Sequence, residues 1–191
     1  MYQRLTPENS LLVIIDIQER LLPVIQNQQQ IVFNARRLTE AAQVFGVPVV
    51  ISEQYPQGLG CTVKELTPYV PKGSAVLSKK SFSIYDDEHI RAEIVQYQRT
   101  QVILYGVESH VCVQQSAFDL LRDGQEVYIV VDAIGSRFAS DHETALRRFE
   151  SSGMALTTTE SLLFEWCRTA DHSQFRTISR LAKESFFGFD H

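Results

Sequence analysis

The stretch LLVIID, residues 11–16, joins five consecutive apolar residues to a carboxylate. An unbroken apolar run of this length, rich in β-branched residues, is typical of a strand buried on both faces of a parallel sheet. The runs VPVVIS, residues 47–52, and VYIVV, residues 127–131, have the same character. Together with shorter runs they predict six strands, at Leu11–Ile15, Val47–Ser52, Ala75–Ser78, Gln101–Tyr105, Glu126–Val131 and Ala155–Thr158.

Helical patterns alternate with these strands along almost the whole sequence. They lie near Ile31–Phe45, Asp87–Tyr97, Val111–Arg122 and Asp141–Ser152. Such alternation implies right-handed crossovers, so the sequence predicts a three-layer α/β fold with one doubly wound, Rossmann-like, six-stranded parallel sheet. No linker or repeat interrupts the pattern, and residues 1–191 are predicted to form a single domain. In such sheets ligands bind beyond the carboxyl ends of the strands.

Composition restricts the class of protein. Of the 191 residues, 44% are apolar and 21% are charged, as in ordinary globular chains. A net charge of -5 argues against a nucleic-acid-binding protein, which needs a basic face. No apolar run approaches the roughly 20 residues of a transmembrane helix. No cleavage site follows a basic leader, so a cytoplasmic protein without membrane contact is expected.

Three side chains at or after predicted strand ends could carry chemistry. Asp16 ends an apolar strand, a placement suited to proton transfer, although a turn or helix-capping aspartate is the simpler interpretation. Lys79 follows another strand, where a lone lysine is ordinarily solvated. Cys112 begins an apolar helix, and a helix N-terminus favours the thiolate. A buried, inert cysteine is the alternative, and it is the one expected for Cys61 and Cys167.

The histidines and the longest loop add weaker signals. His110 lies near Cys112 and could line a pocket, whereas His142 occupies a polar helical face and is expected to be solvated. The stretch Glu53–Pro71 has no clear pattern and is predicted to form a lid or a wall of the site. No metal-ligand spacing joins His89, His172 and His191.

Four segments carry a resemblance to a known family. LLVIIDIQ (11–18), SKKSFSIY (78–85) and GVESHVCVQQSAFDLL (106–121), in that order, resemble the isochorismatase-like cysteine hydrolase superfamily. The segment ISEQYPQGLGCTVKEL (51–66) resembles, within it, the isochorismatase domain-containing hydrolases of bacteria and eukaryotes. The resemblance runs from about Leu11 to beyond Glu160 and implies the isochorismatase-like fold.

The resemblance implies a catalytic triad of Asp16, Lys79 and Cys112. Lys79 is preferred to Lys80 because the family lysine is followed, at the third position, by an aromatic or apolar residue and then by a small one. The pair Phe82-Ser83 fits this pattern from Lys79 only.

The resemblance also implies a cis peptide bond between Val107 and Glu108, although neither residue is proline. Such a bond would fold the turn so that the N–H groups of Glu108 and Cys112 converge on one oxyanion. A trans turn is the alternative, and it is by far the commoner form. Weaker contacts with a substrate are expected from Gln18, Tyr55, Phe82, Ser109 and His110.

Two departures from the family pattern restrict the substrate. Nicotinamidases of the superfamily carry an Asp-x-His metal motif after the second strand, whereas this region reads Ser52-Glu53-Gln54-Tyr55. Neither a metal nor another cofactor is therefore expected. Isochorismatases proper lack the nucleophilic cysteine, so Cys112 indicates acyl transfer at an amide-like C–N bond.

The sequence thus predicts a hydrolase that cleaves a small amide through a thioester on Cys112, with Asp16 as the proton carrier. A catalytically silent scaffold or binding protein with this fold, and a redox-sensing thiol protein, remain as alternatives. A homodimer or higher homo-oligomer is expected, because Phe186-Phe187-Gly188-Phe189 places three aromatic rings near the terminus. Packing of these rings on their own domain is the other interpretation.

Overall fold

One parallel sheet forms the centre of the protein. A computed structural model describes residues 3–186. The strand order is β3-β2-β1-β4-β5-β6, and every pairing is parallel. The strands are β1 (Ser10–Ile15), β2 (Val49–Gln54), β3 (Ala75–Lys79), β4 (Gln101–Val107), β5 (Glu126–Gly135) and β6 (Ala155–Thr157). The predicted α/β fold is confirmed, and each of the six predicted strands overlaps one of these.

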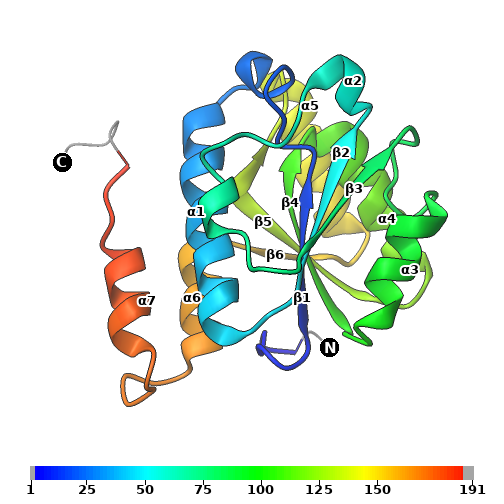
Figure 1. The fold of residues 1–191 in the computed structure, drawn as a ribbon. Helices are drawn as coiled ribbons and strands as arrows, with labels where there is room; N and C mark the ends of the chain where they lie inside the picture. The colour runs from blue at the N-terminus through cyan, green and yellow to red at the C-terminus, as the bar shows by residue number, and fades with distance from the viewer. Residues whose placement is uncertain (1–2, 187–191) are drawn as a thin grey trace.

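Helices cover both faces of the sheet and complete the three layers (Figure 1). α1 and α6 pack on one face with α7 outside them, while α3, α4 and α5 lie on the other face. The carboxyl ends of the strands are at the top of Figure 1, where the short α2 also lies. The helices are α1 (Gln28–Phe45), α2 (Pro56–Leu59), α3 (Glu88–Gln96), α4 (Gln114–Arg122), α5 (Ala139–Ser151), α6 (Thr159–Cys167) and α7 (Phe175–Ala182). Short 3-10 turns, Leu22–Val24 and Thr67–Tyr69, and a π-helical turn, Ser109–Val113, complete the structure.

Burial explains why apolar runs became strands. β1 is buried at all six of its positions, because helices cover both faces of the sheet at its centre. β3 lies at one edge, and its residues alternate between half-buried and exposed until Lys79, which is buried. The edge strand β3 therefore places the buried side chain of Lys79 at its carboxyl end.

Gly106 allows β4 to pass very close to the end of β1. It lies opposite Ile15 in the register of the two strands, with φ of +124°. A Cβ atom at this position would lie 2.0 Å from the Ile15 carbonyl oxygen, so a larger residue would push the strands apart. The register of β4 against β5 also shifts between Leu104 and Gly106. The chain that leaves β4 is thereby brought beside the end of β1.

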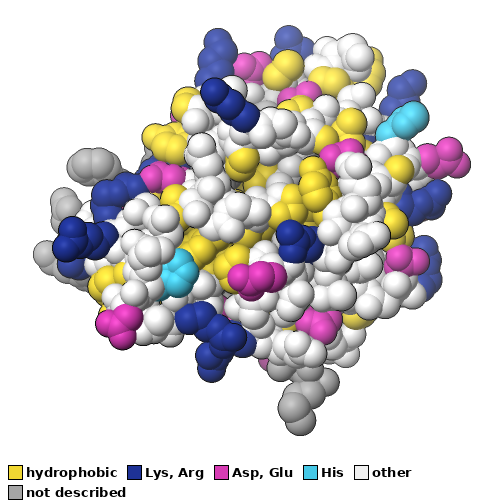
Figure 2. Space-filling model, turned by 60° about the horizontal axis from the view of Figure 1, so that its bottom comes forward, with side chains coloured by type: hydrophobic (Ala, Val, Ile, Leu, Met, Phe, Trp, Pro, Cys, Tyr) yellow, Lys and Arg dark blue, Asp and Glu magenta, His cyan; other side chains and the backbone are white. Residues whose placement is uncertain are grey.

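The surface carries charges of both signs. On the face drawn in Figure 2, which brings the amino ends of the strands forward, basic and acidic side chains are interspersed. Every helix among residues 3–186 is too short or too polar to traverse a bilayer.

The aromatic tail is described only in part. The ring of Phe186 packs on Phe33 of α1, with 5.6 Å between the ring centroids. Phe187 and Phe189 lie outside the described residues. The one tail ring that is described therefore contacts its own domain.

Candidate active site

Three strand ends bring the predicted catalytic residues together. Asp16 directly follows β1, Lys79 ends β3, and Cys112 lies in the π-helical turn that follows β4. β1 is flanked by β2 and β4, and Lys79 lies opposite Gln54 of β2 in the sheet register. The three side chains therefore come from segments that are distant in sequence, and they converge at the carboxyl ends of the strands.

The Asp16 carboxylate is fully buried and has a partner for each oxygen. Lys79 Nζ lies 2.7 Å from Oδ2, and the side chains of both residues are completely shielded from solvent. The Ser52 hydroxyl donates a hydrogen bond of 2.7 Å to Oδ1. Asp16 itself has a left-handed backbone, with φ of 52°. An ionised carboxylate can be kept in such a place because donors surround it.

Lys79 is held by further oxygens around its ammonium group. Nζ donates to Gln54 Oε1 over 2.6 Å, and to the carbonyl oxygens of Phe82 and Ser81 over 3.1 and 3.3 Å. Lys80, the other lysine considered, is exposed. Ser52 and Gln54 lie at the end of a predicted strand, where functional residues are expected, but no specific role in the site was predicted for either.

The Cys112 thiol completes the cluster. Only 5% of the residue is exposed, and the thiol lies near enough to Asp16 and Lys79 for both side chains to act on its pKa. Burial, and after it the negative charge of Asp16, raise the pKa of the Cys112 thiol to about 12, against the lowering effect of Lys79. The expectation of a thiolate favoured by a helix N-terminus is therefore wrong for the free protein. The regular helix α4 begins only at Gln114, and the loss of solvation outweighs the nearby ammonium group.

A raised thiol pKa has a direct consequence for chemical modification. We expect the rate at which iodoacetamide alkylates Cys112 to keep rising with pH up to about pH 10, because thiolate forms only as the pH approaches the raised pKa. Peptide mapping by mass spectrometry across this range measures the rate. The exposed Cys61 is the internal control and should react faster than Cys112 at neutral pH. A Cys112 rate that reached its plateau below about pH 8.5 would contradict the neutral thiol.

The turn between β4 and Cys112 has an unusual backbone. The peptide bond between Val107 and Glu108 is cis, the form that the family resemblance implies. The Glu108 carbonyl accepts hydrogen bonds from the N–H groups of Val111 and Val113, over 3.1 and 3.2 Å. The Glu108 carbonyl thus anchors the π-helical turn, which begins at Ser109, three residues before Cys112.

Comparison with known protein families identifies the relationship. The family model described as the isochorismatase domain matches residues 10–161, a range that includes Asp16, Lys79 and Cys112. The chain belongs to the isochorismatase family.

Relatives in the isochorismatase family match nearly the full chain. Isochorismatase domain-containing protein 2A of Mus musculus is 40% identical over 182 residues, which cover 95% of this chain and 86% of the mouse protein. Isochorismatase domain-containing protein 1 of Danio rerio is 39% identical over 182 residues. That match covers 95% of this chain but only 63% of the zebrafish protein, so the chain spans less than two thirds of this relative's length.

Solved structures of similar proteins share the isochorismatase-family fold. The MAR1 ribonuclease from Caenorhabditis elegans superposes with a TM-score of 0.91 and 35% identity, covering 96% of this chain and 94% of the worm protein. The YcaC gene product from Escherichia coli, described as an octameric hydrolase of unknown specificity, superposes with a TM-score of 0.89. It is 23% identical, with 96% and 92% of the two chains covered, and shows likeness of fold alone.

The residues expected to contact a substrate divide into two groups. Tyr55 and Phe82 are half exposed, at 51% and 53%, on the loops that follow β2 and β3. Gln18 and Ser109 are fully buried. The Gln18 amide bonds to the Gln54 N–H and carbonyl over 2.7 and 3.0 Å and to the Gly60 carbonyl over 2.7 Å, so it fixes the backbone instead of facing a substrate.

Hydrogen bonds hold the stretch predicted to form a lid or wall, residues 53–71, in place. Glu53 Oε1 accepts hydrogen bonds from the Thr62 N–H and hydroxyl, over 2.6 and 2.8 Å. Gln18 bridges the same loop through Gly60. Buried polar contacts therefore hold this loop at two points beside Asp16.

One of the two histidines near Cys112 differs from its predicted role. His142 was expected to be solvated on a polar face, but it is half buried and its Nδ1 lies 3.0 Å from the Ser109 hydroxyl oxygen. That expectation is wrong because the π-helical turn packs against α5. His110 is also half buried, with Nδ1 3.0 Å from the Ser136 hydroxyl oxygen.

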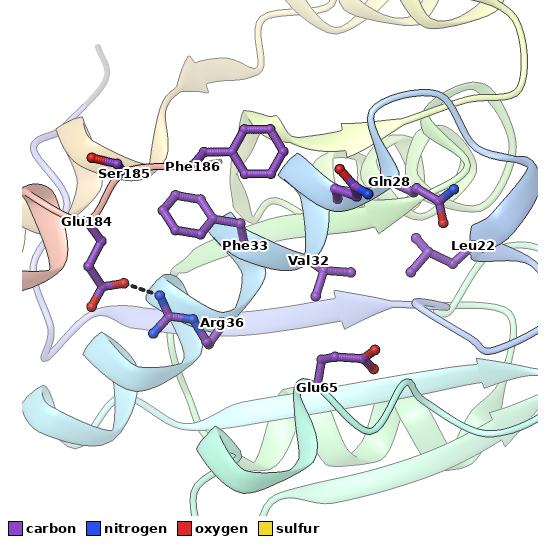
Figure 3. Close-up of a pocket in the computed structure, with 10 residues that line it drawn as sticks. Leu22, Gln28, Val32, Phe33, Arg36, Glu65, Glu184, Ser185 and Phe186 are labelled. Carbon is purple, nitrogen blue, oxygen red and sulfur yellow. Dashed lines mark hydrogen bonds and ion pairs between the residues drawn. The ribbon is translucent and has the colours of Figure 1, made fainter. Parts of the chain in front are cut away.

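Two hollows on the surface differ in their relation to the triad. A cavity of about 430 Å³ borders Lys79 and is lined mainly by polar groups. A larger one of about 900 Å³ lies along α1, where Val32, Phe33 and Phe186 form apolar walls (Figure 3). No triad residue lines the larger cavity. The lining residues of the smaller cavity are Tyr55, Pro56, Gln57, Ser78, Lys79, Lys80, Ser81, Asp86 and Asp87.

Proposed function

We propose that this chain is a metal-independent cysteine hydrolase that cleaves the C–N bond of a small amide. One observation carries the proposal, the buried thiol of Cys112 beside the buried ion pair of Asp16 and Lys79. A nucleophile beside a base that a third group holds in place is the arrangement that covalent catalysis requires.

In the first half of the proposed reaction, the sulfur of Cys112 attacks the amide carbonyl while Asp16 accepts the thiol proton. Because burial raises the pKa of the thiol, it is the neutral thiol that gives up its proton as the sulfur attacks. The backbone N–H groups of Glu108 and Cys112 stabilise the oxyanion that forms. The tetrahedral intermediate collapses as Asp16 returns the proton to the leaving nitrogen, which departs as an amine or ammonia.

In the second half, water attacks the carbonyl of the thioester. Asp16 accepts a proton from this water, the C–S bond breaks, and the proton restores the Cys112 thiol. The carboxylic acid product then leaves. Lys79 holds Asp16 in place through their buried hydrogen-bonded ion pair.

Two observations weigh against the alternatives. A redox-sensing cysteine needs an accessible thiolate, whereas Cys112 is buried and its thiol pKa is raised. A silent scaffold has no need of a fully buried ion pair, which generally contributes little net stability. Both features favour a site kept for chemistry.

The polar side chains at the carboxyl end of β2 support a metal-independent reaction. The Ser52 hydroxyl is bonded to Asp16, and the Glu53 carboxylate is bonded to Thr62. Among residues 3–186, no group of three or more His, Cys, Asp or Glu side chains could hold a metal ion. We accordingly propose that no cofactor takes part.

We also propose a small-molecule substrate, a cytoplasmic location and a homo-oligomeric assembly. The E. coli structure is described as an octamer, which favours a dimer or larger assembly here. The worm structure is described as a ribonuclease. The present chain has a net charge of -5, which is unfavourable for binding a polyanion.

A panel of small primary amides tests the proposal. We expect at least one to release ammonia at a rate proportional to enzyme concentration, with equal amounts of the carboxylic acid formed. The activity should persist after exhaustive treatment with EDTA. A parallel assay offers single-stranded RNA to the same preparation. Absence of ammonia release from every amide, or cleavage of RNA instead, would overturn the amidase proposal.

A further inference from the structure

Three consecutive residues of the turn that carries Cys112 are held by one neighbouring segment. This is the β5–α5 segment, residues 136–142, which leads from the end of β5 into α5. The Glu108 carboxylate accepts hydrogen bonds from the Arg137 N–H and Nε, over 3.0 and 3.2 Å. His110 Nδ1 lies 3.0 Å from the Ser136 hydroxyl oxygen. The residue between them, Ser109, is bound by His142.

The bond between Ser109 and His142 is more enclosed than the contact between Glu108 and Arg137. Ser109 is fully buried, and its hydroxyl oxygen lies 3.0 Å from His142 Nδ1. By contrast, the Arg137 side chain that binds Glu108 is 53% exposed, so water can replace it. A buried hydroxyl that loses its partner cannot form a hydrogen bond with water instead, so this contact is costly to break.

The protonation state of His142 suits this bond. Burial lowers the pKa of His142, and the nearby Glu143 acts in the opposite direction. The neutral ring can accept a hydrogen bond at Nδ1 from the Ser109 hydroxyl. A protonated ring would instead donate at Nδ1 and leave the buried Ser109 proton without its acceptor. The neutral imidazole is therefore the form that satisfies both groups.

Ser109 is also the first residue of the π-helical turn. It follows the cis peptide bond and precedes Cys112 by three residues, so a shift of Ser109 is transmitted to the thiol through one turn of backbone. The histidine itself has no contact with Asp16 or Lys79 among the described hydrogen bonds and ion pairs.

We propose that His142 is a positioning residue, which acts through Ser109 to fix the turn that presents Cys112 to Asp16. The inference rests on the proposed function, since it assigns His142 a part in orienting the same nucleophile. It predicts that loss of the hydrogen bond affects the chemical step more than substrate binding.

The test compares three variants with the wild-type protein. His142→Leu removes the hydrogen bond, and His142→Asn keeps a polar group close to the position of Nδ1. His89→Leu is the matched control, because His89 is exposed on α3. Two readouts are used: kcat and KM for whichever amide the panel identifies, and the rate of Cys112 alkylation by iodoacetamide at neutral pH.

For His142→Leu we expect kcat to fall at least tenfold with KM changed less than threefold. We expect Cys112 alkylation to rise at least threefold, because a loosened turn exposes the thiol. His142→Asn should recover most of both values, and His89→Leu should equal the wild type. If His142→Leu does not fold, Ser109→Ala breaks the same bond from the other side and should give the same two changes.

Wild-type values in folded His142→Leu, or in Ser109→Ala, would overturn the positioning role. Equal impairment of His142→Leu and His142→Asn would also overturn it, because volume and not the hydrogen bond would then matter. If the wild-type protein hydrolyses no amide, the proposed function fails. The alkylation readout would still decide whether His142 positions the thiol.

Discussion

We expect the replacement of Cys112 by serine to abolish amide hydrolysis, lowering kcat by about a thousandfold or more. A serine hydroxyl is a far poorer nucleophile than a thiol at this position, because Asp16 is a weak base for an alcohol. The change is nearly isosteric, so the buried cluster should keep its packing. Ammonia release under saturating amide measures the effect.

Two controls accompany this variant. The melting temperature of Cys112→Ser should stay close to that of the wild-type protein, which separates loss of chemistry from loss of fold. Cys61→Ser should retain full activity, since Cys61 is exposed and is not among the triad residues. Substantial turnover by Cys112→Ser would refute Cys112 as the nucleophile.

The second large effect concerns stability as well as activity. Lys79→Met leaves the Asp16 carboxylate fully buried without its counter-ion. Removing one partner of a buried pair typically costs about 3–5 kcal/mol of unfolding free energy. For a chain of this size that corresponds to a fall in melting temperature on the order of 10 °C. Activity should be lost together with stability, because Asp16 is no longer held.

A double variant distinguishes the two roles of the pair. Asp16→Asn combined with Lys79→Met removes both charges, so most of the lost stability should return while activity remains absent. Calorimetry and the ammonia assay measure the two quantities separately. Lys80→Met is the matched control, since this neighbouring lysine is exposed and its loss should change neither. An unchanged melting temperature for Lys79→Met would contradict the prediction that the variant leaves Asp16 as an unpaired buried charge.

The sequence contained enough information for the sheet and for the convergence of three residues. Apolar runs such as Leu11–Ile15 specify strands that are buried on both faces, and parallel strands place their carboxyl ends at one edge. Asp16 and Lys79 therefore lie in contact, as expected. The helices α6 and α7 were not predicted, because they follow the last strand and lie outside the alternation of strand and helix that guided the interpretation.

The parts that sequence could not supply depend on three-dimensional burial. The state of the Cys112 thiol follows from the balance between desolvation and two opposite charges, which no spacing in the sequence specifies. The contacts of Ser52 with Asp16 and of Gln54 with Lys79 depend on the register of β2 against its neighbours. His142 was judged from its own helix, whereas its contact comes from a turn 33 residues earlier in the chain.

The enclosure of Asp16 has a consequence for the path of hydrogen through the proposed reaction. Its side chain is completely shielded, and both oxygens already hold donors other than water. A proton taken from Cys112 therefore cannot exchange with the bulk while substrate covers the thiol. In the proposed reaction it passes to the nitrogen of the scissile bond. The hydrogen that leaves with the first product is thus the one that the thiol carried. The proposed acylation step therefore exchanges no proton with the solvent.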